Sequence, residues 1–483
     1  MMGIAVILIA LGLLMYLAYR GISLLILAPA LATFAVIATM DGPVLASYTQ
    51  IFMGSAGNFI TLYFPVFLLG AIFGKLMEDT GSAEVLAQAI VKRLGDARAI
   101  LAVVIACAIM TYGGVSLFVV AFAVYPIAAA LFRKADLPKR LIPGTIALGA
   151  FTFTMTALPG TPAIQNAIPM PYFGTSPFAA PGLGILTGLL MLVLGQAWLD
   201  YRARQARTAG EGYGEYEEPA RPPERELRER AAGEGFDLLE VPPQQNPTVL
   251  PGLALAVMPI VLVIGLNLLF TAVVIPAMDT DYLAEPAYGA TSIDSVRGVW
   301  SVIAALVIAI IVLVAMNLRR LPKLTVTLDS GANASLLPIF NTASLVGFGS
   351  VIASLAAFDA ISSWVTSLGG DNPLISLAIA VNVLAGMTGS ASGGMSIALA
   401  TLGDSYLAMG EAAGISPELM HRVTAVATGG LDALPHNGAV ITLLSICGLT
   451  HRQAYLDIAV VGVLVPIMAL VFLITAGTLL GTF

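Results

Sequence analysis

The sequence predicts an all-α polytopic membrane protein made of two inverted-topology repeats, and three observations lead to this fold class. The chain is 58% hydrophobic and only 11% charged over 483 residues, whereas about 25% of the residues of a soluble domain are charged. Its apolar runs reach the ~20 residues that a helix needs to cross a bilayer. Short motifs also recur in the same order in both halves of the chain.

The first predicted repeat covers residues 1–199 and begins with three apolar runs. They lie at 2–19, 22–40 and 58–77 and predict three crossings. The intervening residues 42–57 are mixed in composition. They leave open an extra membrane element, and with it the side of the membrane on which the N-terminus lies.

The next apolar run, residues 97–133, predicts a re-entrant hairpin. At about 1.5 Å of rise per residue it is too long for one crossing and has little room for two. Basic residues stand at both ends, and basic residues mark the cytoplasmic side of a membrane protein. We therefore expect a hairpin that enters from the cytoplasm and turns at Gly113-Gly114; two short crossing helices are the alternative.

A broken helix is predicted at residues 141–170, because Ala157-Leu-Pro-Gly-Thr-Pro162 interrupts an apolar run. Proline removes a backbone donor and disrupts a helix interior. A fifth crossing at 178–199 completes the repeat. Residues 200–247 then form a charged linker, since residues 200–240 alone hold 18 of the 51 charged residues. Arginines beside the preceding crossing place this linker in the cytoplasm.

The second predicted repeat covers residues 248–483 and follows the same plan. Neither end of its hairpin is basic, so this hairpin is expected to enter from outside. The expected elements are crossings at 248–276, 298–318 and 334–357, a re-entrant hairpin at 373–410, a broken helix at 419–447, and a last crossing at 455–481.

Three motif pairs link the halves. Leu62-Tyr-Phe-Pro-Val-Phe67 is similar to Leu336-Leu-Pro-Ile-Phe340, and Gly113-Gly-Val-Ser116 is similar to Gly393-Gly-Met-Ser396. Ala157-Leu-Pro159 matches Ala433-Leu-Pro435, 44 residues after the first Gly-Gly and 40 after the second. With charge placing the copies in opposite orientations, the broken segments are expected to form a substrate and ion site near the bilayer midplane.

The candidate substrate-binding residues lie at the two hairpin tips and the two breaks. Hydroxyls, amides, glycine backbone and helix N-termini are the groups that bind a carboxylate there. Packing of small residues between helices is the competing explanation for the glycines. The candidates are Tyr112, Gly113, Gly114, Ser116, Thr161, Gln165, Asn166, Ser390, Ser392, Gly393, Gly394, His436, Asn437 and Thr442.

Asp432 and His436 are the candidates for proton coupling. Ionisable groups deep in a membrane protein are costly and often relay protons; a buried structural pair is the alternative. The first break has neither residue. No lysine or arginine appears at either break, and His421-Arg422 and His451-Arg452 are expected at interfacial ends of crossings.

The sequence also limits the other chemistries. Cys107 and Cys447 lie in apolar runs and show neither a disulfide framework nor metal-ligand spacing, so no metal or cofactor is expected. Nothing indicates a nucleic-acid partner. An intramembrane enzyme has no nucleophile motif to support it, and a channel would not need two hairpins opening to opposite sides.

Three stretches resemble the gluconate permease (GntP) family of the ion transporter superfamily. They are Gly430-Leu-Asp-Ala-Leu-Pro-His-Asn-Gly-Ala-Val-Ile-Thr-Leu-Leu444, followed by Gly448-Leu-Thr-His-Arg-Gln-Ala-Tyr455, and Thr388-Gly-Ser-Ala-Ser-Gly-Gly394. The resemblance is dense over about 380–460, and the linker at 200–247 departs from the family pattern.

This resemblance implies proton-coupled uptake of a small hydroxy-monocarboxylate: gluconate or another sugar acid, glycerate, or 3-hydroxybutyrate, with D-serine carried by some members. It also implies a homodimer in the bacterial cytoplasmic (inner) membrane, with a scaffold domain and a transport domain that moves like an elevator. A sodium-coupled carboxylate transporter is the first alternative, because unwound carbonyls can also bind Na⁺.

Overall fold

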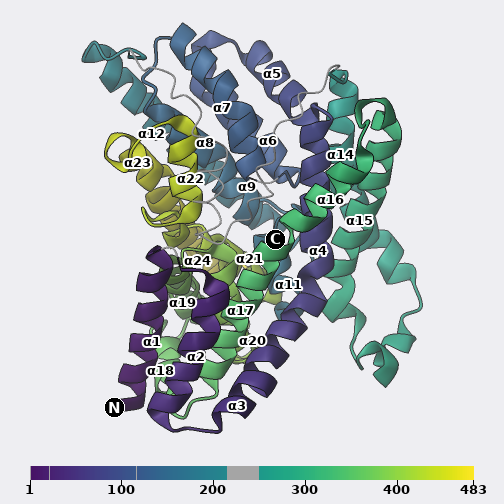
Figure 1. The fold of residues 1–483 in the computed structure, drawn as a ribbon, viewed down its shortest axis with the longest axis vertical. Helices are drawn as coiled ribbons and strands as arrows, with labels where there is room; N and C mark the ends of the chain where they lie inside the picture. Colours follow the sequence, from purple (N-terminus) through teal and green to yellow (C-terminus); the bar gives the residue numbers. More distant parts are fainter. Residues whose placement is uncertain (1, 21, 116, 215–249) are drawn as a thin grey trace.

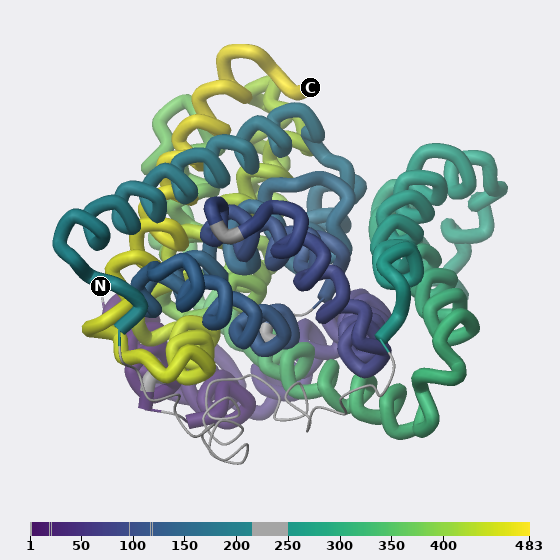
Figure 2. The backbone as a smooth tube through the Cα atoms, turned by 90° about the horizontal axis from the view of Figure 1, so that it is seen from above, coloured from purple at the N-terminus to yellow at the C-terminus, as the bar shows by residue number. Residues whose placement is uncertain are grey.

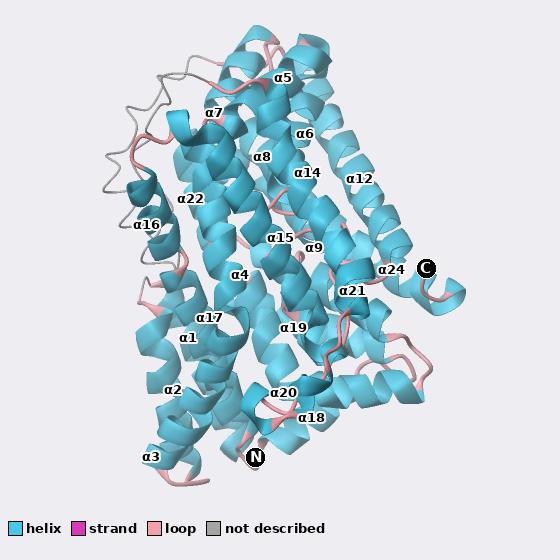
Figure 3. Ribbon diagram, turned by 90° about the vertical axis from the view of Figure 1, so that its right-hand side faces the viewer, coloured by secondary structure: helices cyan, strands magenta, loops and turns pink. Residues whose placement is uncertain are grey.

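The computed structural model describes residues 2–20, 22–115, 117–214 and 250–483, which fold almost entirely as helices (Figures 1 and 3). Six helical segments in this part of the chain are long and apolar enough to cross a membrane, and shorter apolar helices lie between them. The prediction of an all-helical membrane protein with several apolar spans is thus confirmed.

The helices of the first half run from α1 to α12. They are α1 (Met2–Tyr19), α2 (Leu24–Thr39), α3 (Val44–Ala46), α4 (Met53–Asp79), α5 (Ser82–Leu94), α6 (Ala99–Tyr112), α7 (Leu117–Lys134), α8 (Leu141–Ala150), α9 (Phe153–Thr156), α10 (Ile164–Ala167), α11 (Pro169–Phe173) and α12 (Pro181–Thr208).

The helices of the second half run from α14 to α24. They are α14 (Leu253–Leu269), α15 (Ile293–Asn317), α16 (Leu324–Ala334), α17 (Leu336–Ala353), α18 (Phe358–Ser367), α19 (Pro373–Thr388), α20 (Ala391–Ala412), α21 (Pro417–Thr428), α22 (Gly438–Cys447), α23 (His451–Ala459) and α24 (Val465–Leu480).

A constant interval relates the central elements of the two halves. The first residues of α5 and α18, Ser82 and Phe358, lie 276 positions apart. The same interval separates the residues that end α6 and α19, Gly113 and Gly389, and the first residues of α8 and α21, Leu141 and Pro417. Equivalent positions in the two halves can therefore be compared one by one.

The third helix of each half is longer than the hydropathy runs indicate. Residues 44–79 form one continuous helical segment of 36 residues, with a π-helical stretch at Ser47–Phe52. Residues 324–353 form a matching segment of 30 residues. Residues 42–57 therefore hold the start of this long helix and not a separate membrane element.

The two helical hairpins come from opposite ends of the molecule. In Figure 1, α6 and α7 occupy the upper half and α19 and α20 the lower half. The helices α4, α16 and α17 lie between these groups and the α14–α15 pair, which forms an arm at one side in Figure 2.

The two helices of the second hairpin, α19 and α20, pack closely against each other. A Cβ atom at Gly394, in the first turn of α20, would collide with the backbone of Ala385 on α19. A Cβ at Gly393 would collide with the Leu345 side chain on α17. Both glycines therefore allow close packing between helices, which is the alternative to a role in substrate binding.

We expect Gly394→Ala to destabilise the protein by roughly 1–3 kcal/mol, the usual cost of overpacking a filled core. The atom in the way belongs to backbone, which cannot move aside as a flexible side chain can. Thermal unfolding in detergent measures the change. Gly54→Ala on α4, where a Cβ meets nothing within 4 Å, is the matched control and should unfold like the wild type.

Helix α12 extends further than the sequence predicted. It continues to Thr208, nine residues into the segment expected to be linker. Beyond it, Tyr213 N–H donates to Asp136 Oδ1 at 3.0 Å, and Arg140 forms an ion pair with Glu211 at 2.7 Å. The remainder of the predicted linker, from residue 215 to 247, lies outside the described residues.

Candidate substrate and ion site at the two helix breaks

The second break separates α21 from α22. Ser416 caps the start of α21, with Pro417 in the first turn. After Thr428 the backbone passes through two glycines and a 3₁₀ turn at Leu431–Ala433, and Leu434 is extended. Pro435 cannot donate to a continued helix, so the next helix begins only at Gly438.

Three hydrogen bonds tie this break to the second hairpin. His436 Nε2 lies 3.0 Å from Gly386 O, a carbonyl that only accepts, so Nε2 carries a proton. Asn437 Nδ2 donates to Gly389 O at 2.7 Å. On the other side, Leu431 N–H donates to Asn382 Oδ1 at 3.2 Å. His436 and Asn437 thus both contact the second hairpin near its tip, and Asn382 of α19 contacts the same break.

Two helix N-termini meet at this place. Asn437 caps α22 by accepting from Ala439 N–H at 2.7 Å, and Ser390 caps α20 by accepting from Gly393 N–H at 3.1 Å. The bond from Asn437 to Gly389 joins the two starts. Helix N-termini present free N–H groups and partial positive charge, which favour an anion.

Hydroxyl groups surround the start of α20. Ser390 Oγ and Ser392 Oγ are 3.4 Å apart, and Ser392 Oγ is 3.5 Å from Thr342 Oγ1 of α17. Thr342 was not predicted from the sequence. The structure therefore groups Ser390, Ser392, His436 and Asn437 in one place and adds Thr342.

The structure aligns the hairpins of the two halves differently from the sequence motifs. The glycine at the turn of the second hairpin is Gly389, with φ of 61°, and not Gly393 or Gly394. It lies 276 positions after Gly113, which ends α6. The pairing of Gly113-Gly114 with Gly393-Gly394 was thus four residues out of register.

Asp432 and His436 do not lie on one face of a continuous helix. Asp432 lies in the 3₁₀ turn, and the extended Leu434 separates it from His436, which breaks the helical spacing that would place both on one face. His436 bonds to Gly386 O of the second hairpin. Asp432 is partly buried within the break.

The first break is tied to its own hairpin in the same manner. Tyr112 O–H donates to Pro159 O at 2.6 Å. Gly114 has φ of 91° and packs against Pro162, so a side chain there would be both strained and obstructed. Thr161 Oγ1 accepts from Ala163 N–H at 3.3 Å, 276 positions before the equivalent cap at Asn437.

Helix α14 also contacts this break. Asn267 Nδ2 donates to Gly160 O at 3.2 Å, and Gly113 lies against the Ile260 side chain. Neither α14 residue was predicted. Gly113 is enclosed by protein, as the packing alternative for the tip glycines expected.

Asn166 lies at the centre of a buried polar cluster behind the first break. Its Nδ2 donates to Thr161 O at 3.0 Å and to Pro177 O at 2.9 Å. Its Oδ1 lies 3.1 Å from Arg422 Nη1 and 3.2 Å from His421 Nε2. Asn166 is fully buried, so its contacts are with protein.

The expectation that His421 and Arg422 are interfacial is wrong, and so is the expectation that no basic residue stands at a break. Both side chains have 0% exposure. Arg422 Nη1 donates to Thr156 O at 3.1 Å, at the edge of the first break. His451 of the other pair is exposed, with Nε2 2.8 Å from Pro435 O.

Three predicted residues remain to be placed. Thr442 is buried in α22. Gln165 in α10 is half-buried, and its Oε1 has no hydrogen-bond partner. Ser116 lies outside the described residues.

The two halves interlock around the breaks. Helix α22 packs on α7 of the first hairpin, and α11 packs on α20 of the second. Tyr125 O–H donates to Cys447 O at 3.3 Å across the first of these contacts. The two tips and two breaks form one connected core.

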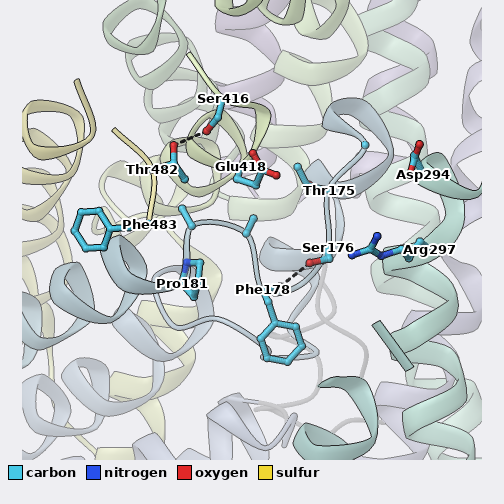
Figure 4. Close-up of a pocket in the computed structure, with 13 residues that line it drawn as sticks. Thr175, Ser176, Phe178, Pro181, Asp294, Arg297, Ser416, Glu418, Thr482 and Phe483 are labelled. Atoms are coloured by element: carbon cyan, nitrogen blue, oxygen red, sulfur yellow. Dashed lines mark hydrogen bonds between the residues drawn. The ribbon is translucent and has the colours of Figure 1, made fainter. Parts of the chain in front are cut away.

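A cavity of about 710 Å³ lies at the end of this core, between the 174–181 loop, the start of α15 and the start of α21. Figure 4 shows Asp294 and Arg297 from α15 on one side of it and Ser416 and Glu418 on the other. Thr175 and Ala179 line this cavity and also bind His421 and Arg422.

Comparison with solved structures identifies a protein of the same fold. The solved structure of MtrF from Neisseria gonorrhoeae, an antimetabolite efflux pump, has the same fold, with a TM-score of 0.52 over 89% of this chain and 84% of that chain. The sequences are 13% identical, so the likeness concerns the fold alone.

The chain belongs to the GntP permease family. The profile described as "GntP family permease" matches residues 1–479. The uncharacterized transporter YxjC of Bacillus subtilis (strain 168) is 46% identical over 463 residues, 95% of each chain. An uncharacterized transporter of Haemophilus influenzae is 35% identical over 98 residues, 20% of this chain and 23% of that one. The family resemblance is confirmed, and the chain is a transporter and not an enzyme.

We expect Asn437→Ala to destabilise the protein by about 1–2 kcal/mol, since it removes an N-cap and the bond to Gly389. Anion binding at the α20 and α22 N-termini should weaken as well, because these N-termini lose the side chain that joins them. Thermal unfolding and substrate-induced shifts in Tm measure both effects. Asn437→Asp keeps the side-chain oxygen that caps α22 but loses the Nδ2 donor to Gly389. This variant should therefore restore the stability more than the binding.

Proposed function

We propose that this chain is a secondary active transporter that takes up a small hydroxy-monocarboxylate together with protons. The proposed substrates are gluconate or another sugar acid, glycerate, or 3-hydroxybutyrate. One observation carries the proposal: the N-termini of α20 and α22 converge at Gly389 and Asn437. Helix N-termini favour the carboxylate.

The groups around these N-termini suit the remainder of such a substrate. Ser390, Ser392 and Thr342 offer hydroxyls that both donate and accept hydrogen bonds. A polyhydroxy chain has the complementary groups. A fully apolar carboxylate would leave these hydroxyls unpaired, which disfavours its binding.

Asp432 is the proposed carrier of the coupled proton. It is an acid within a broken helix of a membrane-spanning core, and such groups commonly belong to proton or ion pathways. It lies on the same break as His436, which is held to the hairpin tip through Gly386. Movement of the hairpin relative to the break would change the surroundings of both residues, and this supports coupling.

The repeated element order supports two inverted repeats, residues 1–199 and 248–483, that alternate access like an elevator. The 276-residue interval relates the hairpins, the breaks and α5 with α18, and the hairpins enter from opposite ends. We assign the two hairpins and two breaks to the transport domain, and α4, α14, α15, α16 and α17 to the scaffold. The protein is then a homodimer in the bacterial cytoplasmic membrane.

Uptake into proteoliposomes tests this function. Labelled gluconate, glycerate and 3-hydroxybutyrate are offered under an inward proton gradient, an inward sodium gradient, or neither. We expect accumulation of at least one hydroxy acid under the proton gradient alone, with propionate, which lacks a hydroxyl, as the control solute. Accumulation driven by sodium alone would establish the sodium-coupled alternative. Saturable accumulation under no condition, with folded protein, would contradict both.

A further inference from the structure

The most unusual charge in the described core is Arg422 of α21. Its side chain is fully buried. Nε and Nη2 donate to Ala179 O at 3.2 and 2.7 Å, and Nη1 donates to Thr156 O and Asn166 Oδ1, each at 3.1 Å. The guanidinium thus binds three oxygen atoms, and no carboxylate among the described residues forms an ion pair with it.

The neighbouring histidine adds no second charge. Asn166 Nδ2 donates to two carbonyls, so its Oδ1 is the atom that faces His421 and must accept from Nε2–H. Thr175 Oγ1 lies 2.6 Å from Nδ1 and can donate to it. Both ring nitrogens are satisfied in the neutral form. The cluster therefore carries one net positive charge, on Arg422.

The oxygens around Arg422 are the kind that a small cation binds. Thr156 is the last residue of α9, and carbonyls at a helix C-terminus are left without intrahelical partners and carry partial negative charge. In transporters with broken helices, such carbonyls coordinate the coupling ion. Carbonyl and amide oxygens are also the usual ligands of hard cations. Here a side chain of the second half supplies the cation instead.

The second break lacks this arrangement. The position equivalent to Arg422, at the 276-residue interval, is Ile146 of α8, which is fully buried and apolar. The position equivalent to Thr156 is Asp432, and the position equivalent to Asn166 is Thr442. The packing is equivalent too, because α21 contacts α10 and α8 contacts α22. Where the first break has the buried cation Arg422, the second has the acid Asp432.

We infer that Arg422 is a built-in cation that occupies the first break in place of an exchangeable coupling ion, so that only the second break binds an ion that is transported. This inference deepens the proposed function and rests on it. It assigns Arg422 as a positioning residue that neutralises the carbonyls of the first break permanently. It also accounts for the acid at one break and not at the other.

Cation-dependent thermal stability tests the inference without substrate or a proton gradient. Wild type and Arg422→Ala are unfolded in sodium chloride, in choline chloride, and in choline chloride with millimolar guanidinium. The wild type should have the same Tm in all three. Arg422→Ala should lose stability in choline and gain at least ~2 °C in sodium or guanidinium, because a ligand that binds only the folded state raises Tm.

The inference is overturned if folded Arg422→Ala responds to no cation more than the wild type does. If Arg422→Ala does not fold, Arg422→Lys and Arg422→Gln decide. Arg422→Lys keeps a tethered cation, so its Tm should not depend on the cation in solution and it should take up substrate like the wild type. Arg422→Gln should lose uptake, and its Tm should rise in sodium. The inference would be overturned if Arg422→Lys and Arg422→Gln lost uptake equally and the Tm of Arg422→Gln did not respond to cations. Because the Tm measurement does not depend on transport, failure of this inference can be told apart from failure of proton-coupled uptake.

Discussion

Asp432→Asn is expected to abolish proton-driven accumulation. The amide has nearly the shape of the acid but cannot carry a proton across the membrane. A pH gradient of about one unit supplies ~1.4 kcal/mol, enough to sustain about a tenfold gradient of a substrate moved with one proton. We expect this ratio to fall to about one in Asp432→Asn, while the site groups at Ser390 and Asn437 stay intact.

Two measurements separate loss of coupling from loss of folding. Downhill entry or exchange of labelled substrate should persist in Asp432→Asn, since binding does not need the coupled proton. Asp359→Asn, at an exposed acid in the first turn of α18, is the control and should accumulate substrate like the wild type. Tenfold accumulation by Asp432→Asn would show that the proton is carried elsewhere.

Asp457→Ala is expected to cause a large loss of stability. Asp457 is 1% exposed. Its Oδ1 accepts from Trp198 Nε1 at 3.1 Å and Arg202 Nε at 2.9 Å, and its Oδ2 accepts from Arg140 Nη1 at 3.3 Å. The carboxylate therefore holds α8, α12 and α23 together at one end of the core.

Removing one member of a buried ion pair usually costs about 3–5 kcal/mol, because the other charge is left uncompensated. We expect about 3 kcal/mol, the lower end, since Arg140 and Arg202 are 17% and 18% exposed and keep some solvent. Thermal unfolding in detergent measures it. A Tm equal to that of the wild type would show that this cluster does not stabilise the core.

Glu211→Gln is the matched control for Asp457→Ala, because it removes an exposed partner of the same Arg140. Glu211 is 41% exposed, and exposed pairs contribute about 0–1 kcal/mol. The Arg140 guanidinium, which donates to the Glu211 carboxylate, holds the pKa of Glu211 below its usual value. The small stabilisation from this pair is therefore complete at neutral pH and is lost as the pH falls through the lowered pKa.

The sequence predicts the break at 419–447 well because the signals there are local. Proline and glycine interrupt a helix wherever they occur in an apolar run, and Asp432, His436 and Asn437 stand out in such surroundings. The positions of the first break followed from the Ala-Leu-Pro match. In the structure the first break lies between α9 and α10 and the second between α21 and α22.

Arg422 could not be recognised because its burial depends on tertiary packing. A basic residue near the start of an apolar run is usually interfacial, but α21 lies among α9, α10, α11, α19 and α24 and is surrounded by protein. The interval of 276 residues would have helped, since it aligns Arg422 with the apolar Ile146 in the middle of α8. The Ala-Leu-Pro match at 157 and 433 has this interval, but the Gly-Gly match at 113 and 393 has an interval of 280, because the second Gly-Gly pair packs α20 against α19 and α17.

Proton influx driven by substrate tests the central claim most directly. Proteoliposomes containing a pH-sensitive dye, with no initial gradient, receive gluconate, glycerate or 3-hydroxybutyrate outside. Coupled uptake predicts that the lumen becomes acidic as the transported acid enters, in the wild type and not in Asp432→Asn. Entry of labelled substrate with an unchanged lumenal pH would contradict proton coupling at the second break.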